Sequence, residues 1–126
     1  MKKLLYLGIV LILGSCGSST VNVDGREVST IKIGDLEVMT EDLGKMNWYE
    51  AKKACKNLGD GWRLPTKDEL NLLFYNEDEI GGFTNNFYWS STEKKVVYAW
   101  WQSFRYGTQR SGNKDNDYDV RAVRAF

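Results

Sequence analysis

The sequence predicts an α+β domain in which two helices pack on a small antiparallel sheet with long loops. Pro65, the only proline, separates two helical patterns, because it forces the residue before it out of helical geometry. From Phe87 onward, aromatic and β-branched residues dominate, as is typical of strands. A chain of 126 residues is long enough for one domain, so the helices and these strands have to share a core.

Each predicted helix begins at a residue that can cap it. Asn47 and Thr66 are followed three residues later by Glu50 and Glu69, which is the capping-box pattern. After the first cap, apolar residues recur at helical spacing until Gly59, which is suited to end the helix. We therefore expect one helix on each side of the proline.

The rest of the domain is expected to consist of strands and turns. A hairpin or a pair of short strands is predicted over residues 21–33, where Asp24-Gly25 supplies a two-residue turn, and a short strand follows over residues 36–39. Residues 108–117 are polar and are expected to form a long loop or an irregular hairpin. The later strands are predicted over residues 87–91, 96–104 and 118–126.

The beginning of the chain is typical of a secretion signal. Two lysines precede an apolar run over residues 4–13, which is shorter than the roughly 20 residues that a membrane-spanning helix needs. The run ends in Leu13-Gly14-Ser15-Cys16, a motif that resembles the lipobox of bacterial lipoproteins. An ordinary secretion signal with a chance cysteine is the alternative interpretation.

The lipobox resemblance implies a division of the chain. Residues 1–15 would be removed as a lipoprotein signal peptide, Cys16 would carry the lipid, and residues 16–20 would form a tether. Residues 21–126 would form the domain. The implied partner is a membrane, reached through the N-terminal lipid, and the expected location is the bacterial cell envelope, at the outer membrane.

Charge and cysteine content restrict the function classes. The chain has 17 basic and 17 acidic residues, and the expected signal accounts for two of the basic ones. The sequence therefore lacks the excess of basic residues that is typical of nucleic-acid-binding domains. Lipidation of one of the two cysteines would leave Cys55 without a disulfide partner. Cys55 lies on the apolar face of the first helix, which favours a small buried hydrophobe over a reactive or ligating thiol.

Residues 47–126 carry a series of short motifs: Trp48-Tyr49-Glu50-Ala51, Gly59-Asp60-Gly61-Trp62-Arg63-Leu64-Pro65-Thr66, Glu69-Leu70, Gly81-Gly82-Phe83, Tyr88-Trp89-Ser90-Ser91-Thr92-Glu93 and Val120-Arg121-Ala122-Val123-Arg124. In these motifs the segment resembles the DUF1566 family, whose members are similar to the C-type lectin-like fold. This resemblance implies two helices flanking an antiparallel sheet, and it implies no known catalytic residues. Upstream, Asp24-Gly25-Arg26, Ile31-Lys32-Ile33-Gly34 and the segment from Met39 to Leu43 resemble the Fibrobacter succinogenes major paralogous domain.

Aromatic side chains form one candidate ligand surface, because flat rings stack on sugars and anchor protein partners with little loss of conformational entropy. Three tryptophans are expected to be buried in the core: Trp62, Trp89 and Trp100. The remaining candidates for ligand binding are Trp101, Tyr106 and Tyr118.

Three aspartates at alternate positions, Asp115, Asp117 and Asp119, form a candidate metal site. Oxygen ligands at this spacing suit Ca²⁺. A solvated loop is the alternative, because the sequence lacks the triplets typical of sugar-binding C-type lectins. No other cofactor is expected.

Three arginines lie inside the family-like motifs: Arg63, Arg121 and Arg124. We expect them to hold loops in place through bidentate bonds to acidic residues, with anion binding as the alternative. The acidic candidates are Asp60, Asp68 and Glu93.

Together, these patterns predict a lipid-anchored binding or adhesion module of the cell envelope that carries out no catalysis. The sequence has no histidine, no serine in a Gly-x-Ser-x-Gly context and no glycine-rich phosphate loop. The expected ligand is a glycan or a protein, bound by loops over residues 94–98 and 105–118. Two alternatives remain open: a structural envelope lipoprotein with no dedicated ligand, and a receptor-binding protein with diversified loops.

Overall fold

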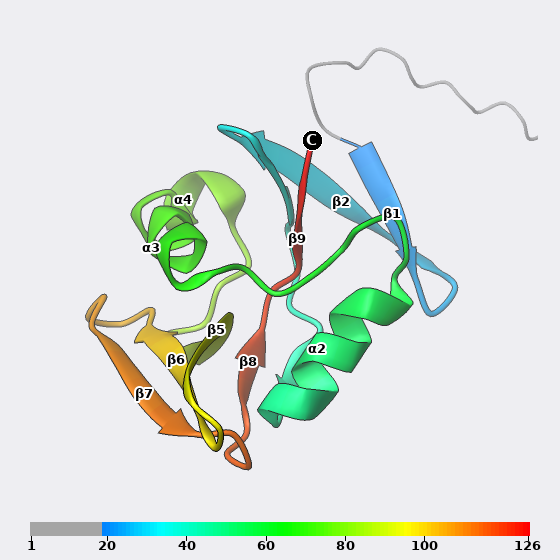
Figure 1. Ribbon diagram of the computed structural model, residues 1–126. Helices are drawn as coiled ribbons and strands as arrows, with labels where there is room; N and C mark the ends of the chain where they lie inside the picture. Colours follow the sequence, from blue (N-terminus) through cyan, green and yellow to red (C-terminus); the bar gives the residue numbers. More distant parts are fainter. Residues whose placement is uncertain (1–18) are drawn as a thin grey trace, which may run out of the picture.

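The computed structural model describes residues 19–126, which form two β-sheets with three helices beside them (Figure 1). The expected signal peptide and Cys16 lie outside these residues, and the first strand begins at Ser19, two positions before the expected start of the domain. The helices are α2 (Trp48–Asn57), α3 (Lys67–Tyr75) and α4 (Glu77–Ile80). The strands are β1 (Ser19–Val23), β2 (Arg26–Ile33), β3 (Leu36–Met39), β4 (Gly44–Met46), β5 (Phe87–Lys95), β6 (Tyr98–Ser103), β7 (Gln109–Asn113), β8 (Tyr118–Val120) and β9 (Val123–Ala125).

The expected α+β, C-type lectin-like architecture is wrong. Within residues 19–126, nine strands form a four-stranded and a five-stranded sheet, whereas the helices have only 10, 9 and 4 residues. The fold is therefore mostly β, and it is not a helix pair on one small sheet. Two segments account for the difference: residues 19–39 contribute three strands to a second sheet, and the polar segment expected as a long loop or an irregular hairpin contains β7.

The first sheet has the order β1-β2-β3-β9, and all its neighbours are antiparallel. The predicted hairpin is confirmed, with Asp24 and Gly25 in its turn at φ values of 51° and 81°. Two positive φ values in succession are what a two-residue hairpin turn of this hand requires, and Asp and Gly tolerate them. The hairpin brings β2 beside β3, which in turn pairs with β9.

The second sheet has the order β4-β8-β5-β6-β7. Its strands are antiparallel neighbours except for β5 and β8, which run parallel and pair at Tyr88 and Asp119. The parallel pairing consists of this one residue pair. Phe87 and Tyr118, which precede it on the two strands, therefore lie at the end of the pairing. This local feature positions the pocket described below.

The strand predicted over residues 118–126 is divided between the two sheets. β8 belongs to the five-stranded sheet and β9 to the four-stranded one, with the fully buried residues Arg121 and Ala122 between them. Figure 1 shows this segment in red running through the middle of the molecule, with α3 and α4 on one side and α2 on the other. The chain between β8 and β9 therefore joins the two sheets.

Both predicted helix starts are confirmed. The side chains of Asn47 and Thr66 accept hydrogen bonds from the backbone N–H of Glu50 and Glu69, and each glutamate accepts one from the backbone of its cap residue. Pro65 lies between the two helices, as its ring requires. Among residues 19–126, no helix has the length and apolar character needed to cross a bilayer.

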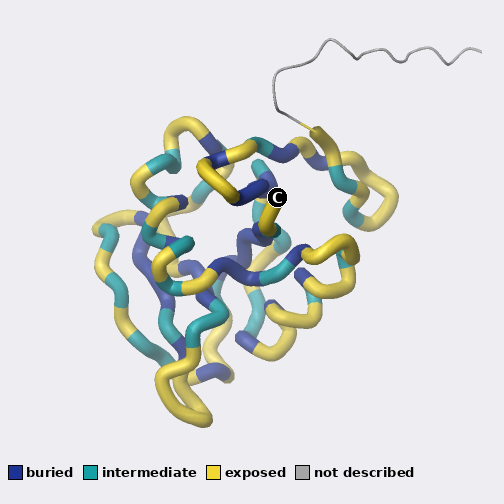
Figure 2. Tube along the Cα trace, turned by 45° about the horizontal axis from the view of Figure 1, so that its top comes forward, coloured by how far each residue is buried: buried dark blue, intermediate teal, exposed yellow. Residues whose placement is uncertain are grey.

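Two apolar clusters form the core, one under α2 and one under α3. Figure 2 shows buried residues along the central strands and exposed residues at the turns on the periphery. Trp62 and Trp89 are buried as expected, but Trp100 is only half-buried. Cys55 is fully buried, and burial raises the pKa of its thiol to about 12. A small buried hydrophobe is therefore the correct description of Cys55.

The three arginines hold the fold together, but their partners differ from those expected. The ion pairs are Arg63 with Glu69, Arg121 with Asp42 and Arg124 with Glu37. Of the expected acidic partners, Asp60 contributes only its backbone oxygen, which accepts from Arg124. Glu69 lies on α3, Glu37 on β3 and Asp42 just after β3. Whether these acids come close to the arginines therefore depends on strand pairing and on how the chain packs.

Candidate ligand-binding pocket

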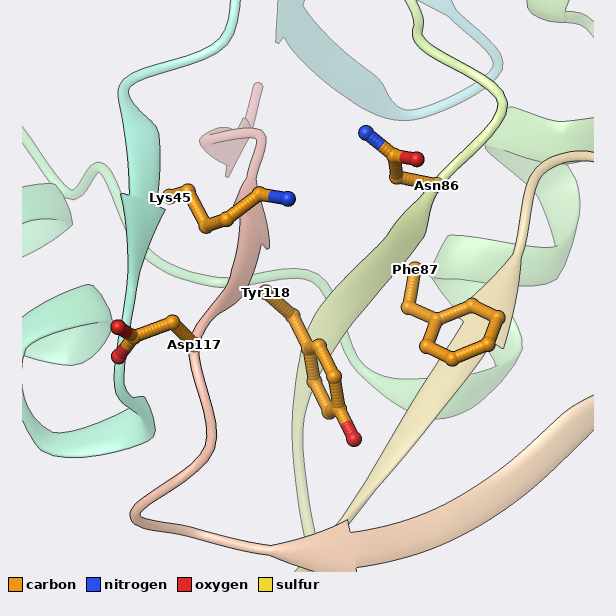
Figure 3. A pocket seen from close by; sticks show the side chains of 5 residues that line it. All are labelled: Lys45, Asn86, Phe87, Asp117 and Tyr118. Atoms are coloured by element: carbon orange, nitrogen blue, oxygen red, sulfur yellow. The ribbon is translucent and has the colours of Figure 1, made fainter.

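A pocket of roughly 250 Å³ lies where the parallel strands β5 and β8 begin, next to β4 (Figure 3). We call it the β5–β8 pocket. Tyr118 is the first residue of β8 and Phe87 the first of β5, so both precede the single residue pair that joins the strands. The pocket is lined by Lys45, Asn86, Phe87, Asp117 and Tyr118.

Its apolar part is a group of three rings, Phe87, Tyr118 and Trp101, which we call the aromatic platform. Phe87 stacks on Trp101, with ring centroids 4.0 Å apart and planes inclined by 19°. Tyr118 meets Phe87 edge to face, with centroids 5.4 Å apart and an interplanar angle of 77°. Phe87 is 38% exposed although it is a large apolar ring, whereas Trp101 beneath it is 9% exposed. The platform therefore exposes the Phe87 ring to solvent, while the Trp101 ring beneath it holds Phe87 in place.

The polar part of the pocket provides both donors and acceptors. Lys45 extends from β4 toward Asn86, and the carboxylate of Asp117 and the ring of Tyr118 point away from each other (Figure 3). An ammonium group donates hydrogen bonds, a carboxylate accepts them, and an amide does both. All three polar side chains are exposed, so a ligand with several hydroxyl groups can reach them.

The loop before β5 is attached to β8 by hydrogen bonds. The Thr84 hydroxyl donates to Asp119 over 2.7 Å, and its backbone N–H donates to the Tyr88 hydroxyl over 2.9 Å. Tyr88 in turn donates to Asp42 over 2.7 Å, and burial raises the pKa of Tyr88, so its phenol remains a donor at neutral pH. These bonds position Asn86 and Phe87 before any ligand arrives.

On the far side of the platform, β7 packs closely because residue 112 is a glycine. A Cβ atom on Gly112 would lie 2.9 Å from the indole nitrogen of Trp101 and 3.2 Å from the hydroxyl oxygen of Tyr118. Asn116 also donates to the Tyr118 hydroxyl over 3.1 Å. The rings of the platform are thus supported by β7 and by the turn after it.

The structure separates the three ligand-binding candidates predicted from the sequence. Tyr118 lines the pocket, and Trp101 lies beneath it. Tyr106 is in the turn between β6 and β7, is 71% exposed and does not line the pocket. Trp100, which was expected to be buried, is the ring that lies partly open, with the ammonium groups of Lys67 and Lys94 3.8 and 5.2 Å from its centroid.

Sequence reasoning missed Phe87, Asn86 and Lys45. Phe87 could have been found, because it shares a strand face with Trp89, and Tyr118 packs against both. Lys45 could not, because β4 is three residues long and has no strand pattern. Its place in the pocket depends on the pairing of β4 with β8.

The three aspartates of the predicted calcium site do not form a ligand set. Asp119 is buried and accepts from Thr84, whereas Asp115 and Asp117 are exposed. Across residues 19–126, no three His, Cys, Asp or Glu side chains lie close enough together to hold a metal ion. Of the three, only Asp117 lines the β5–β8 pocket.

Comparison with known proteins identifies the family. The family model described as Lcl C-terminal domain matches residues 25–124. The match begins in the turn between β1 and β2 and ends within β9, so β1 is the one strand of the two sheets that lies wholly outside it. No curated protein matches the chain.

Proposed function

The chain belongs to the Lcl C-terminal domain family, and we propose that it is a lipid-anchored binding module of the bacterial cell envelope whose ligand is a carbohydrate. The proposed site is the β5–β8 pocket, with the aromatic platform as the surface on which a sugar ring stacks. The module binds its ligand without transforming it. The resemblances to DUF1566 and to the Fibrobacter succinogenes major paralogous domain are part of this proposal.

The observation that carries the proposal is the exposed Phe87 ring beside polar side chains. A sugar ring has an apolar C–H face and a rim of hydroxyl groups, so it needs a flat apolar surface with hydrogen-bonding groups at the edge. Phe87 provides the flat surface and Tyr118 stands edge-on beside it. Lys45 and Asn86 provide hydrogen-bonding groups at the edge, and Asp117 lies on the outer side of the pocket. A protein ligand would require a larger apolar area than these rings expose.

Pre-organisation supports the same conclusion. Binding is weakened when side chains have to be ordered as the ligand arrives. Here Phe87 is fixed by its stack on Trp101, and the adjacent loop is fixed by the bond from Thr84 to Asp119. The pocket of roughly 250 Å³ is smaller than the sites that enclose drug-sized ligands. We infer that one sugar unit occupies it and that the rest of the glycan lies on the surface.

The anchor is proposed from the lipobox-like motif that ends at Cys16. A lipid there would place the module at the outer membrane. Replacement of Cys16 by serine is expected to move the protein from the membrane fraction to the soluble fraction and to abolish labelling by a radioactive fatty acid. A Cys16→Ser protein that remains lipid-labelled and membrane-bound would contradict this part of the proposal.

The carbohydrate is tested with the Cys16→Ser protein on a glycan array, followed by titration calorimetry with the best ligand. We expect saturable binding that Phe87→Ala weakens at least about tenfold, as for a central aromatic contact. Tyr106→Ala is the matched control, because it removes an exposed ring outside the pocket, and it should leave the affinity unchanged. Binding should survive chelation of Ca²⁺, and the glycan should be recovered intact. An empty array would favour the alternative of a structural lipoprotein.

A further inference from the structure

A second cavity, separate from the β5–β8 pocket, lies between α2 and the segment that follows it. It has a volume of roughly 220 Å³, its walls are mainly carbon, and we call it the α2 groove. It shares no lining residue with the β5–β8 pocket. The α2 groove is lined by Lys52, Lys56, Trp62, Arg63, Leu64 and Ser91.

The groove carries an excess of positive charge. Lys52 and Lys56 lie one helical turn apart on α2 and are exposed, and neither forms an ion pair within residues 19–126. Arg63 also lines the groove, but Glu69 binds its guanidinium through two hydrogen bonds of 2.6 and 3.0 Å. The Lys52 ammonium group lies 4.5 Å from the centroid of the Trp48 ring, so Lys56 is the freer charge and Lys52 is the second one that a ligand can attract.

The acidic groups around the groove are already bound by other residues. Glu93, which lies near Lys52, accepts from the ammonium group of Lys114. Glu37 is paired with Arg124, whose guanidinium lies 4.6 Å from the centroid of the Trp62 ring. Glu69 and Glu37 are thus held by arginines, whereas Glu93 also attracts Lys52, and this attraction contributes to the lowered pKa of Glu93.

Trp62 forms part of the apolar wall of the groove. This residue is 3% exposed, and its indole N–H has no hydrogen-bond acceptor among residues 19–126. The indoles of Trp48 and Trp89 donate to the backbone oxygens of Ser90 and Met46, whereas that of Trp101 also lacks an acceptor in the described part of the chain. Because the Trp62 N–H itself is buried, the part of Trp62 that the groove offers to a ligand is the apolar surface of its ring.

We infer that the α2 groove binds an apolar monocarboxylate, with the apolar body against Trp62 and Leu64 and the carboxylate between Lys52 and Lys56. The apolar walls exclude a strongly hydrated polyanion, and the two lysines favour a negatively charged group over a neutral one. The proposed occupant is a free acid of about six carbons, which suits the small volume of the groove. The carboxyl end of a peptide whose last side chain is apolar shares this chemistry and is the competing outcome of the test.

The test uses the Cys16→Ser protein labelled with ¹⁵N, titrated at constant pH. The readout is the indole N–H resonance of Trp62, assigned by its loss in Trp62→Phe. Hexanoate is expected to shift this resonance saturably, whereas hexanol, which lacks the charge, and acetate, which lacks the apolar body, should bind at least about tenfold more weakly. N-acetyl-leucine represents the peptide source, and the tighter of the two carboxylates identifies the source.

Variants on α2 provide matched controls. The double substitution Lys52→Gln and Lys56→Gln should weaken hexanoate binding at least about fivefold, because it removes both charges. Lys53→Gln removes an exposed lysine of the same helix that does not line the groove, and it should change the affinity less than twofold. Phe87→Ala should have no effect, which separates this inference from the carbohydrate proposal. Equal binding of hexanol and hexanoate, an unmoved Trp62 resonance, or an equal loss in Lys53→Gln would each overturn it.

Discussion

Phe87 lies flat on Trp101, with 4.0 Å between the ring centroids, yet the two rings differ in exposure, at 38% and 9%. The upper ring faces the β5–β8 pocket, and the lower one belongs to the core. The stack thus separates recognition from stability: the exposed ring can be replaced without opening the core, whereas the buried ring cannot.

The first prediction concerns these two rings. Phe87→Ala should lower the free energy of unfolding by about 1 kcal/mol, whereas Trp101→Ala should lower it by about 3–5 kcal/mol, because it leaves a cavity in the core. Urea denaturation followed by circular dichroism measures both. Equal losses would mean that Phe87 is also a core residue and that the aromatic platform is not a separate surface.

The second prediction concerns the buried ion pair of Arg121 and Asp42, whose nearest atoms are 2.8 Å apart. The Arg121 side chain is fully buried and also donates to the backbone oxygens of Met39 and Gly81. Arg121→Met or Asp42→Asn should each lower the free energy of unfolding by about 3–5 kcal/mol, because each leaves its partner buried without a counter-charge.

The double variant is the control for this pair. Its loss should be clearly smaller than the sum of the two single losses, since neither charge is then left alone. Denaturation curves of the four proteins give the coupling energy. Strictly additive losses would show that the two side chains act independently.

The third prediction compares the adjacent glycines Gly81 and Gly82, whose φ values are 82° and 77°. Alanine at either position is strained by about 1–3 kcal/mol, because L-residues avoid positive φ values, and at Gly81 the φ of 82° is combined with a ψ of 168° that essentially only glycine adopts. A Cβ on Gly81 would meet no atom within 4 Å, whereas one on Gly82 would collide with the backbone oxygen of Thr40. Gly82→Ala should therefore cost at least about 2 kcal/mol more than Gly81→Ala. Similar melting temperatures for the two variants would contradict this packing.

The fourth prediction is a pH dependence that originates at Glu37. Burial by itself would raise the pKa of this carboxyl group, but hydrogen bonds from Ser19, Thr30 and Arg124 outweigh it and lower the pKa from 4.5 to about 2. Because the folded pKa is depressed, the stabilisation is present above pH 4.5 and is lost as the pH falls toward 2.

The size of this effect is on the order of 3 kcal/mol, because each pKa unit of the depression corresponds to about 1.4 kcal/mol. It is measured from urea midpoints between pH 5 and pH 2 for the wild type and for Glu37→Gln. The difference between the two proteins should shrink as the pH falls, because the wild type then loses the ionised carboxylate that the variant never has. A constant difference would assign the acid sensitivity to other carboxylates.

Features that depend on neighbouring residues could be predicted from the sequence, whereas the pairing of strands that are distant in the sequence could not. The caps at Asn47 and Thr66, the turn at Asp24-Gly25 and the burial of Cys55 each depend on neighbouring residues, and all are confirmed. The number of sheets depends on which strands pair, and a periodicity of two residues holds no information about partners. This is why a mostly β fold was interpreted as two helices on one sheet.

The candidate site shows the same division. Tyr118 was identified because it is aromatic and follows a polar segment, but Lys45 reaches the pocket only through the pairing of β4 with β8. Trp100 and Trp101 are adjacent and point to opposite faces of β6, and the sequence does not say which face is covered. The expectation that Trp100 is the buried one was wrong for this reason.

The short connection between β8 and β9 also affects when the domain can fold. One sheet needs residues 118–120 to link β4 to β5, and the other needs residues 123–125 beside β3. During synthesis, neither sheet can therefore be completed until its strand from residues 118–125 has been made. Loss of residues 123–126 would remove β9 and leave β3 as an unpaired edge of the four-stranded sheet, whereas β8 would remain in the other sheet.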